Sequence, residues 1–175
     1  MTPRVRSLRP EGWPVWRELR LRALAEAPHA FGSTLAEWTG DGDREARWRA
    51  RLALPGSRSF VASLGDQDVG MASGIPGETA GVTELTSFWV APEARGQGVG
   101  DALIRAVEDF ARASGSALLE LAVRPDNAPA LALYRRNGLT DTGPHGDVTP
   151  DGRREHLLRK PLTGDDVQRS FNSPW

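Results

Sequence analysis

Residues 90–100 read Val90-Ala91-Pro92-Glu93-Ala94-Arg95-Gly96-Gln97-Gly98-Val99-Gly100. Residues 81–90 have the pattern of a strand, and residues 98–114 keep apolar side chains at helical spacing. The first amides of a helix lack internal partners, the helix dipole attracts an anion, and glycine lets a ligand approach the backbone. The stretch therefore predicts a turn that binds a diphosphate, and the alternative is a tight turn without a ligand.

Two common nucleotide-binding motifs do not fit this turn. A dinucleotide-binding fingerprint that starts at Gly96 requires glycine at its sixth place, which is Asp101. No Gly-Lys-Ser or Gly-Lys-Thr follows at the spacing of a nucleoside-triphosphate loop. The turn therefore belongs to neither class.

The composition is that of an ordinary globular chain. Its 175 residues, 39% hydrophobic and 26% charged, predict one compact domain over residues 1–162 and a polar tail at 163–175. A net charge of -1 gives no basic field, so we expect no nucleic-acid partner. We find neither a signal-peptide pattern nor a run of ~20 apolar residues that would span a bilayer. We therefore expect a cytoplasmic protein without membrane contact.

Cysteine is absent, which excludes disulfides, thiolate metal sites and an enzyme cysteine that carries an acyl group. The three histidines, His29, His145 and His156, do not have metal-ligand spacing, and the acidic residues are scattered. We therefore expect no metal.

Strand and helix patterns alternate along the rest of the chain. Strands are expected at residues 5–8, 59–63, 68–74, 81–90, 117–123, 139–142 and 153–160. Helices are expected from Val15 to Pro28, from a Ser33 or Thr34 cap to Pro55, at 98–114 and at 127–137. The first strands predict an antiparallel meander, and the strand, helix, strand, helix order after residue 81 requires a parallel crossover. The fold class is therefore mixed α+β.

Two motifs together resemble the GNAT superfamily of N-acyltransferases. Arg95-x-x-Gly98-x-Gly100, preceded by Val90-x-Pro92, is similar to its acyl-CoA pyrophosphate loop. About a helix length later comes a motif like its second one, Asn127 followed by Leu133-Tyr134-Arg135-Arg136-Asn137-Gly138-Leu139. The specific resemblance covers residues 81–139. Ala94, Asp101 and Leu139 depart from the residues that are usual in the family.

The resemblance implies a central mixed, mostly antiparallel sheet of about seven strands flanked by about four helices. It implies that acyl-CoA is held at the splay between the two central strands. The residues that it assigns to acetyl-CoA binding are Phe88, Trp89, Val90, Arg95, Gly96, Gln97, Gly98, Val99, Gly100, Asn127 and Tyr134. Arg95 can instead pair with a surface acid, and Asn127 can cap a helix.

Glu84 is the first candidate for the catalytic base. An alkylamine with a pKa near 10 is only about 0.1% neutral at pH 7, so a proton must be removed before the amine attacks a thioester. The family often uses a glutamate on this strand, frequently through water. A solvent-facing or paired glutamate is the alternative.

Tyr134 is the only tyrosine in the chain. The departing CoA thiolate benefits from a proton donor, and a phenol with a pKa near 10 can supply the proton. The resemblance gives Tyr134 this role. A core aromatic residue with its hydroxyl at the edge is the alternative.

The resemblance implies an N-acetyltransferase in which an amine attacks acetyl-CoA directly within a ternary complex. The acceptor can be a small-molecule amine or an amine of a protein or peptide; Trp38, Trp48 and Glu78 are candidates to line its site. The alternative is a non-catalytic acyl-CoA-binding sensor or interaction module. We also expect that a homodimer is possible.

Overall fold

The computed structural model describes residues 1–162, which form two compact units. The first unit consists of Met1–Ile75 and Leu85–Val107. The second consists of Pro76–Glu84 and residues 108–162 of the described chain. A single domain over residues 1–162 stays a prediction, and the expected tail at 163–175 lies outside the described residues.

The strands and helices of residues 1–162 follow the predicted order and confirm the α+β class. The strands are β1 Arg4–Leu8, β2 Arg58–Leu64, β3 Gln67–Pro76, β4 Val82–Val90, β5 Leu118–Val123, β6 Thr140–Asp141 and β7 His156–Pro161. The α-helices are α1 Trp13–Glu26, α2 Glu45–Leu52, α3 Val99–Ala113 and α4 Ala128–Arg136. Among the residues described, no helix combines the length and the apolar character needed to cross a bilayer.

The strands are hydrogen-bonded neighbours in the order β1-β2-β3-β4-β5-β7-β6. β1 with β2, β2 with β3, β5 with β7 and β6 with β7 are antiparallel pairs. β4 and β5 are parallel, with Val82–Glu84 in register with residues 118–120. The sheet is therefore mixed and mostly antiparallel, and α3 makes the predicted crossover between the two parallel strands.

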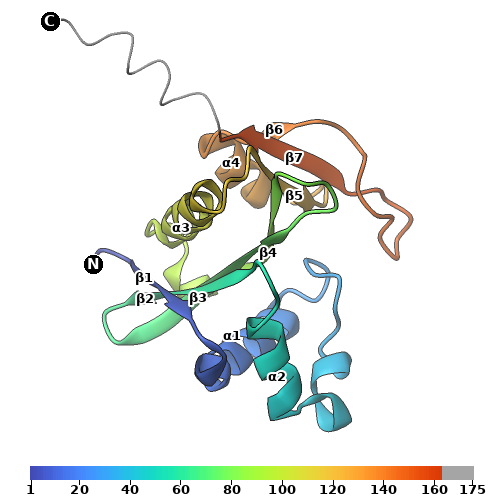
Figure 1. The fold of residues 1–175 in the computed structure, drawn as a ribbon. Helices are drawn as coiled ribbons and strands as arrows, with labels where there is room; N and C mark the ends of the chain where they lie inside the picture. The colour runs from blue at the N-terminus through green and yellow to red at the C-terminus, as the bar shows by residue number, and fades with distance from the viewer. Residues whose placement is uncertain (163–175) are drawn as a thin grey trace, which may run out of the picture. The chain divides into compact units, whose positions relative to one another are not determined.

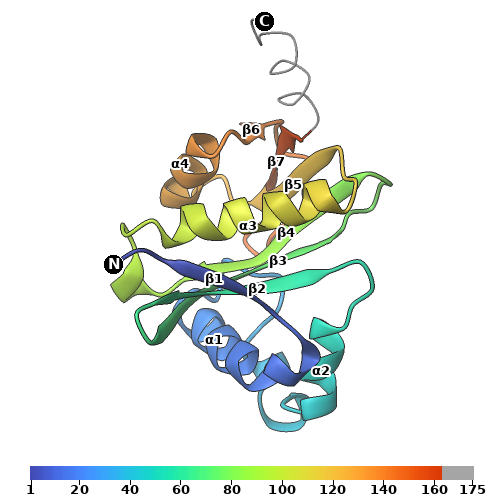
Figure 2. The same ribbon diagram turned by 60° about the vertical axis from the view of Figure 1, so that its left-hand side comes forward.

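The first unit packs helices on both faces of its strands. Figure 2 shows α1 and α2 on one face of β1, β2 and β3, and the first half of α3 on the other. Helical spacing places Val15, Trp16, Leu19 and Ala23 on one face of α1, and the helix buries the last three while Val15 stays partly exposed. On the other face, a Cβ atom at Gly70 of β3 would come within 2.9 Å of Val99. Glycine at this position therefore lets the start of α3 lie close to the strand.

The segment between α1 and α2 corrects one expected boundary. Thr34 accepts a hydrogen bond from the amide of Glu37 at 3.4 Å, but the turn that follows is only a short 3-10 helix, Ala36–Trp38. At Gly42 a Cβ atom would lie 1.9 Å from the carbonyl oxygen of Glu37, so the chain folds back on itself here. The α-helix therefore begins later than predicted, at Glu45.

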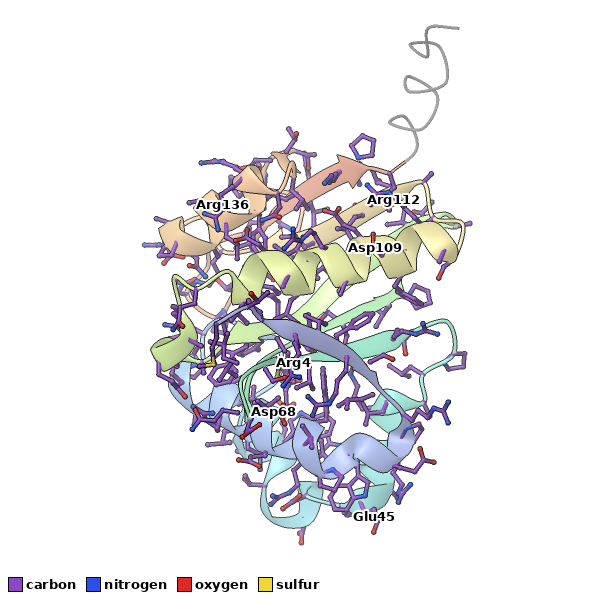
Figure 3. The ribbon with its side chains drawn as sticks, turned by 90° about the vertical axis from the view of Figure 1, so that its left-hand side faces the viewer. Arg4, Glu45, Asp68, Asp109, Arg112 and Arg136 are labelled. Atoms are coloured by element: carbon purple, nitrogen blue, oxygen red, sulfur yellow. The ribbon has the colours of Figure 1, made fainter. Side chains whose placement is uncertain are left out.

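The second unit is built on β5, β7 and β6. β7 pairs with β5 over six residues and with the short β6 on its other edge (Figure 1). Leu119, Leu121 and Leu158 form the buried centre of these strands. α4 buries Leu131 and Tyr134. The exposed side of α3 in this unit carries Asp109 and Arg112, labelled in Figure 3.

An ion pair between Lys160 and Glu108 joins three elements of the second unit. The Lys160 ammonium donates to Glu108 Oε1 at 2.9 Å and to the carbonyl oxygen of Asn137 at 2.9 Å. Glu108 is 5% exposed, so its charge is largely removed from water. The contact ties the second half of α3 to β7 and to the end of α4.

We expect Lys160→Met to destabilise the protein by about 2 kcal/mol. Breaking a fully buried pair costs about 3–5 kcal/mol, and the smaller value follows because Lys160 stays partly exposed and Arg112 also approaches Glu108. The double variant Glu108→Leu, Lys160→Met leaves no unpaired charge and should recover part of the loss. Urea unfolding of the three proteins measures this; a double variant less stable than Lys160→Met would contradict it.

Candidate functional site

The predicted phosphate-binding turn lies entirely in the first unit. A short 3-10 helix, Pro92–Ala94, follows β4, and α3 begins at Val99. Gly96 and Gly98 have φ angles of 76° and 82°, and a Cβ atom at either position would meet nothing within 4 Å. Glycine is needed here for its backbone conformation, and the space beside the turn is open to a ligand.

Glu26, the last residue of α1, holds this turn in place. Its carboxylate accepts hydrogen bonds from Trp89 Nε1 at 2.9 Å and from Arg95 Nη2 at 2.9 Å. The Trp89 hydrogen bond and the Arg95 guanidinium lower the pKa of Glu26. Arg95 also donates to the carbonyl oxygen of Val90 at 3.1 Å. Arg95 thus pairs with an acid, and its contact with phosphate stays a prediction.

A second set of contacts joins α1 to the same turn. Arg22 pairs with Glu93 at 2.8 Å and lies 5.2 Å from the ring centroid of Trp89. Gln97 donates from its side chain to the carbonyl oxygen of Glu93 at 3.1 Å. We did not predict these anchors. A negative charge in the last turn of a helix is unfavourable, because it lies at the negative end of the helix dipole. The position of Glu26 in α1 was therefore the one sequence feature that indicated a need for a positively charged partner.

Glu84, the predicted base, lies in the second unit on β4. It is half-buried, and none of the described residues makes a hydrogen bond or ion pair with its carboxylate. Burial raises the pKa of Glu84, and the charge of Glu120 raises it further. Glu120 stands opposite Glu84 in the parallel register and pairs with Arg159 at 2.6 Å. Glu84 therefore has the environment of a carboxylate that can accept a proton.

Glu84 is part of a wider group that we call the acidic cluster: Glu78, Glu84, Glu120, Asp147 and Glu155. Each of the other four carboxylates raises the pKa of Glu84. Asp147 and Glu155 come from the loop between β6 and β7, where the Glu155 amide donates to the Asp147 carbonyl at 2.9 Å. We missed these two because a loop has no periodicity. The surroundings of Glu84 are therefore locally negative, which favours a nearby ammonium group.

Tyr134 and Asn127 lie on α4, also in the second unit. Tyr134 is 7% exposed, and burial raises the pKa of its phenol, which keeps it protonated. Asn127 caps the helix by accepting from the amide of Ala130 at 3.3 Å. Tyr134 is therefore a buried aromatic residue and Asn127 a helix cap, and the contacts of both with acetyl-CoA stay predictions.

Trp38 and Trp48 line a pocket of about 260 Å³ in the first unit, which we call the tryptophan pocket. Trp16 of α1 and Ser87 of β4 also line it. Glu78, the third residue predicted near an acceptor, belongs instead to the acidic cluster in the second unit. Within residues 1–162, no group of three or more histidine or acidic side chains is placed to hold a metal ion.

Residues 14–139 match the model of the Acetyltransferase (GNAT) family. The chain belongs to this family. The predicted resemblance is confirmed, and this GNAT protein is an acyl-CoA-dependent acetyltransferase with acetyl-CoA as its cosubstrate.

Known GNAT proteins resemble this chain in sequence and fold. The IAA acetyltransferase of Azospirillum brasilense is 37% identical over 111 residues, which are 63% of this chain and 72% of the relative. The streptothricin acetyltransferase of Streptomyces lavendulae is 40% identical over 69% of this chain and 64% of its own length. The structure of yncA from Salmonella typhimurium, solved with its cofactor acetyl-CoA, has 21% identity and a TM-score of 0.72 over 94% of this chain and 96% of that one. This last likeness shows the GNAT fold.

We expect Gly98→Ala to weaken acetyl-CoA binding about tenfold. A side chain at φ 82° costs about 1 kcal/mol or more, and relief of that strain moves the amides at the start of α3. Gly115→Ala is the matched control, because Gly115 has φ 81° and open space at the other end of α3. Both variants should melt earlier by similar amounts, while calorimetric titration with acetyl-CoA separates them. Equal affinities for acetyl-CoA would exclude the turn as the diphosphate site.

Proposed function

We propose that this GNAT acetyltransferase transfers an acetyl group to a primary amine by direct attack in a ternary complex, with Glu84 as base and Tyr134 as acid. The environment of Glu84 carries the proposal. A half-buried carboxylate without a hydrogen-bond partner among the described residues, surrounded by like charges, is an unfavourable arrangement for stability alone. Such groups are common where a proton must be moved.

Glu84 acts first in this scheme. The acidic cluster attracts the acceptor as an ammonium ion, and Glu84 takes a proton from it, directly or through water. The raised pKa of Glu84 is nearer to the working pH than that of an exposed glutamate. Glu84 is therefore the stronger base of the two. The neutral amine nitrogen then has the lone pair that forms the new bond to the acetyl carbon.

Tyr134 acts on the leaving group. Bound acetyl-CoA supplies a thioester, whose carbon–sulfur bond breaks as the carbon–nitrogen bond forms. The attacking nitrogen loses a second proton to solvent as the amide forms. The phenol of Tyr134 gives its proton to the departing sulfur and regains one from solvent. Once Glu84 returns its proton to solvent, the net products are the amide, free thiol and one proton. Burial keeps this phenol protonated over the whole working pH range.

The diphosphate is assigned to the amides of Gly96 to Gly100, and the pantetheine arm to Val90 and Asn127. The open space at Gly96 and Gly98 supports the first assignment. Phe88, Trp89 and Arg95 stay proposed contacts of this ligand, and the hydrogen bonds of Trp89 and Arg95 with Glu26 favour a role in holding the turn.

Two acceptor classes are consistent with the relatives. Two of them are named for small molecules, and another for the ribosomal protein bS18. An amine of a small molecule or of a protein is therefore proposed as the acceptor. A cytoplasmic location, a homodimer and the absence of a nucleic-acid partner stay predictions.

The test is thiol release from acetyl-CoA over a panel of amines, with the wild type beside Tyr134→Phe. We expect the variant to lose about 100-fold in kcat, because a positioned acid contributes roughly that factor, and to keep its affinity for acetyl-CoA. Thermal melting serves as the folding control for both proteins. Acetyl-CoA binding without turnover of any amine would favour the non-catalytic sensor, in which Tyr134 is only a core aromatic.

The pH profile of kcat/KM tests the base. Only ionised Glu84 accepts a proton, so activity should fall as pH drops through its raised pKa, at a higher pH than an ordinary glutamate would give. Glu120→Gln removes one like charge and leaves Arg159 unpaired, and both changes lower the pKa of Glu84. The acid limb should therefore move to lower pH in Glu120→Gln and disappear in Glu84→Gln. An acid limb unchanged in both variants would exclude Glu84.

A further inference from the structure

The tryptophan pocket contains cations without anions. Arg20 of α1 and Arg51 of α2 both line it, and Arg20 is only 8% exposed. No acid among the described residues forms an ion pair with either guanidinium. Burial and the charge of Arg51 lower the pKa of Arg20 to about 10, and burial lowers the pKa of Arg51. Arg20 is buried and Arg51 is partly buried, and two neighbouring charges of the same sign in such a place are costly to keep.

The pocket also contains hydrogen-bond donors without acceptors. Arg20 Nη1, Arg51 Nη1 and Trp38 Nε1 are buried and have no hydrogen-bond partner among the described residues. All three side chains line the pocket. Buried donors are nearly always satisfied, so three unsatisfied donors in one pocket indicate a missing acceptor. A carboxylate has two oxygens that accept up to about four hydrogen bonds. Its negative charge would also give the two guanidinium groups the counter-ion that they do not have among the described residues.

The other walls include two packed aromatic rings and a strand residue in an unusual conformation. The Trp38 and Trp48 rings lie 4.5 Å apart, and Trp48 Nε1 donates to Asp43 at 2.8 Å. Arg51 Nη2 donates to Ser87 Oγ at 3.3 Å, and Ser87 has a φ angle of 53°. A serine in this left-handed conformation costs about 1 kcal/mol, which a stable strand would avoid. The pocket therefore combines a preorganised cationic end with an apolar surface.

We propose that the tryptophan pocket binds a carboxylate of the acceptor through Arg20, Arg51 and Trp38, so that the acceptor is an amino acid or a similar amine that carries a carboxylate. This specificity rests on the proposed function, whereas carboxylate binding itself does not. Thr86 and Ser87 of β4 also line the pocket, so its wall includes the strand that leads to the phosphate-binding turn of the same unit.

The binding test uses the full chain without acetyl-CoA. The probes are 3-phenylpropanoate and 3-phenylpropanamide, which have nearly the same shape and differ in charge. Tryptophan fluorescence and thermal shift report binding, since three tryptophans line the pocket. We expect the acid to bind at least ~10-fold more tightly than the amide. The carboxylate accepts charge-assisted hydrogen bonds from the arginines, whereas the neutral amide group accepts weaker ones. Equal affinities, or no binding of the acid, would overturn the proposal.

Variants on α2 locate the site. Arg51→Gln should reduce the affinity for 3-phenylpropanoate at least ~10-fold. Arg49→Gln is the matched control, because Arg49 is on the same helix and pairs with Glu45, which Figure 3 labels on α2. This control should bind the acid as the wild type does. Loss of binding in both variants, or in neither, would show that the acid does not bind at Arg51.

A third variant separates binding from folding. Arg51→Met removes one of two buried like charges and keeps most of the apolar volume, so its melting temperature should be equal to or higher than that of the wild type. It should nevertheless lose the thermal shift produced by 3-phenylpropanoate. A lower melting temperature together with a retained shift would show that Arg51 serves the fold and not the ligand.

An activity assay with acetyl-CoA compares L-phenylalanine with L-phenylalaninamide as acceptors. The amide has the less basic amine, more of which is neutral at pH 7, so chemistry alone favours it. We expect the acid to have the higher kcat/KM, and Arg51→Gln to reverse the order by raising KM for the acid at least ~10-fold with little change in kcat. Preference of the wild type for the amide would overturn the acceptor assignment. Failure to bind acetyl-CoA would instead overturn the proposed function, and the result with 3-phenylpropanoate would remain valid.

Discussion

The parallel pairing of β4 with β5 is the constraint on which the rest of the chain depends. Parallel neighbours cannot be joined by a tight turn, so the chain has to leave the end of β4 and return to the start of β5, and α3 makes that return. The few residues between Val90 and Val99 must therefore reverse direction into a helix, and Gly96 and Gly98 allow it with positive φ angles. The parallel pairing of β4 with β5 thus accounts both for the proposed diphosphate turn and for the exposed start of α3 beside it.

This part of the fold could be predicted because its signals are local. The apolar spacing of α3 repeats over 15 residues, and the glycines adjoin it in sequence. The break between α1 and α2 could not be predicted in the same way, since Thr34 is a valid helix cap and only the close approach at Gly42 shows that the chain turns back. The contact of Glu26 with Trp89 and Arg95 joins residues more than 60 positions apart, and no short pattern encodes it.

The residues of the candidate site also differ in whether the sequence could predict them. Tyr134 and Glu84 could be selected because each lies within or beside a motif that resembles the family. Arg20 could not, because α1 is rich in arginine and helical spacing alone does not show which guanidinium is buried. Arg17 pairs with Asp43 and Arg22 with Glu93, whereas Arg20 has no acid partner among the described residues. The difference depends on the residues that surround each side chain in the folded unit.

Each unit keeps charges that its own residues do not neutralise. The first has Arg20 and Arg51 in the tryptophan pocket, and the second has Glu84 within the acidic cluster. Methionine or leucine in place of Arg20 and Arg51 would avoid both the desolvation cost and the repulsion, at the loss of the contact of Arg20 with the Phe31 ring at 4.5 Å. A carboxylate in the tryptophan pocket would relieve the repulsion between Arg20 and Arg51, and a simple amine without a carboxylate would leave that repulsion in place.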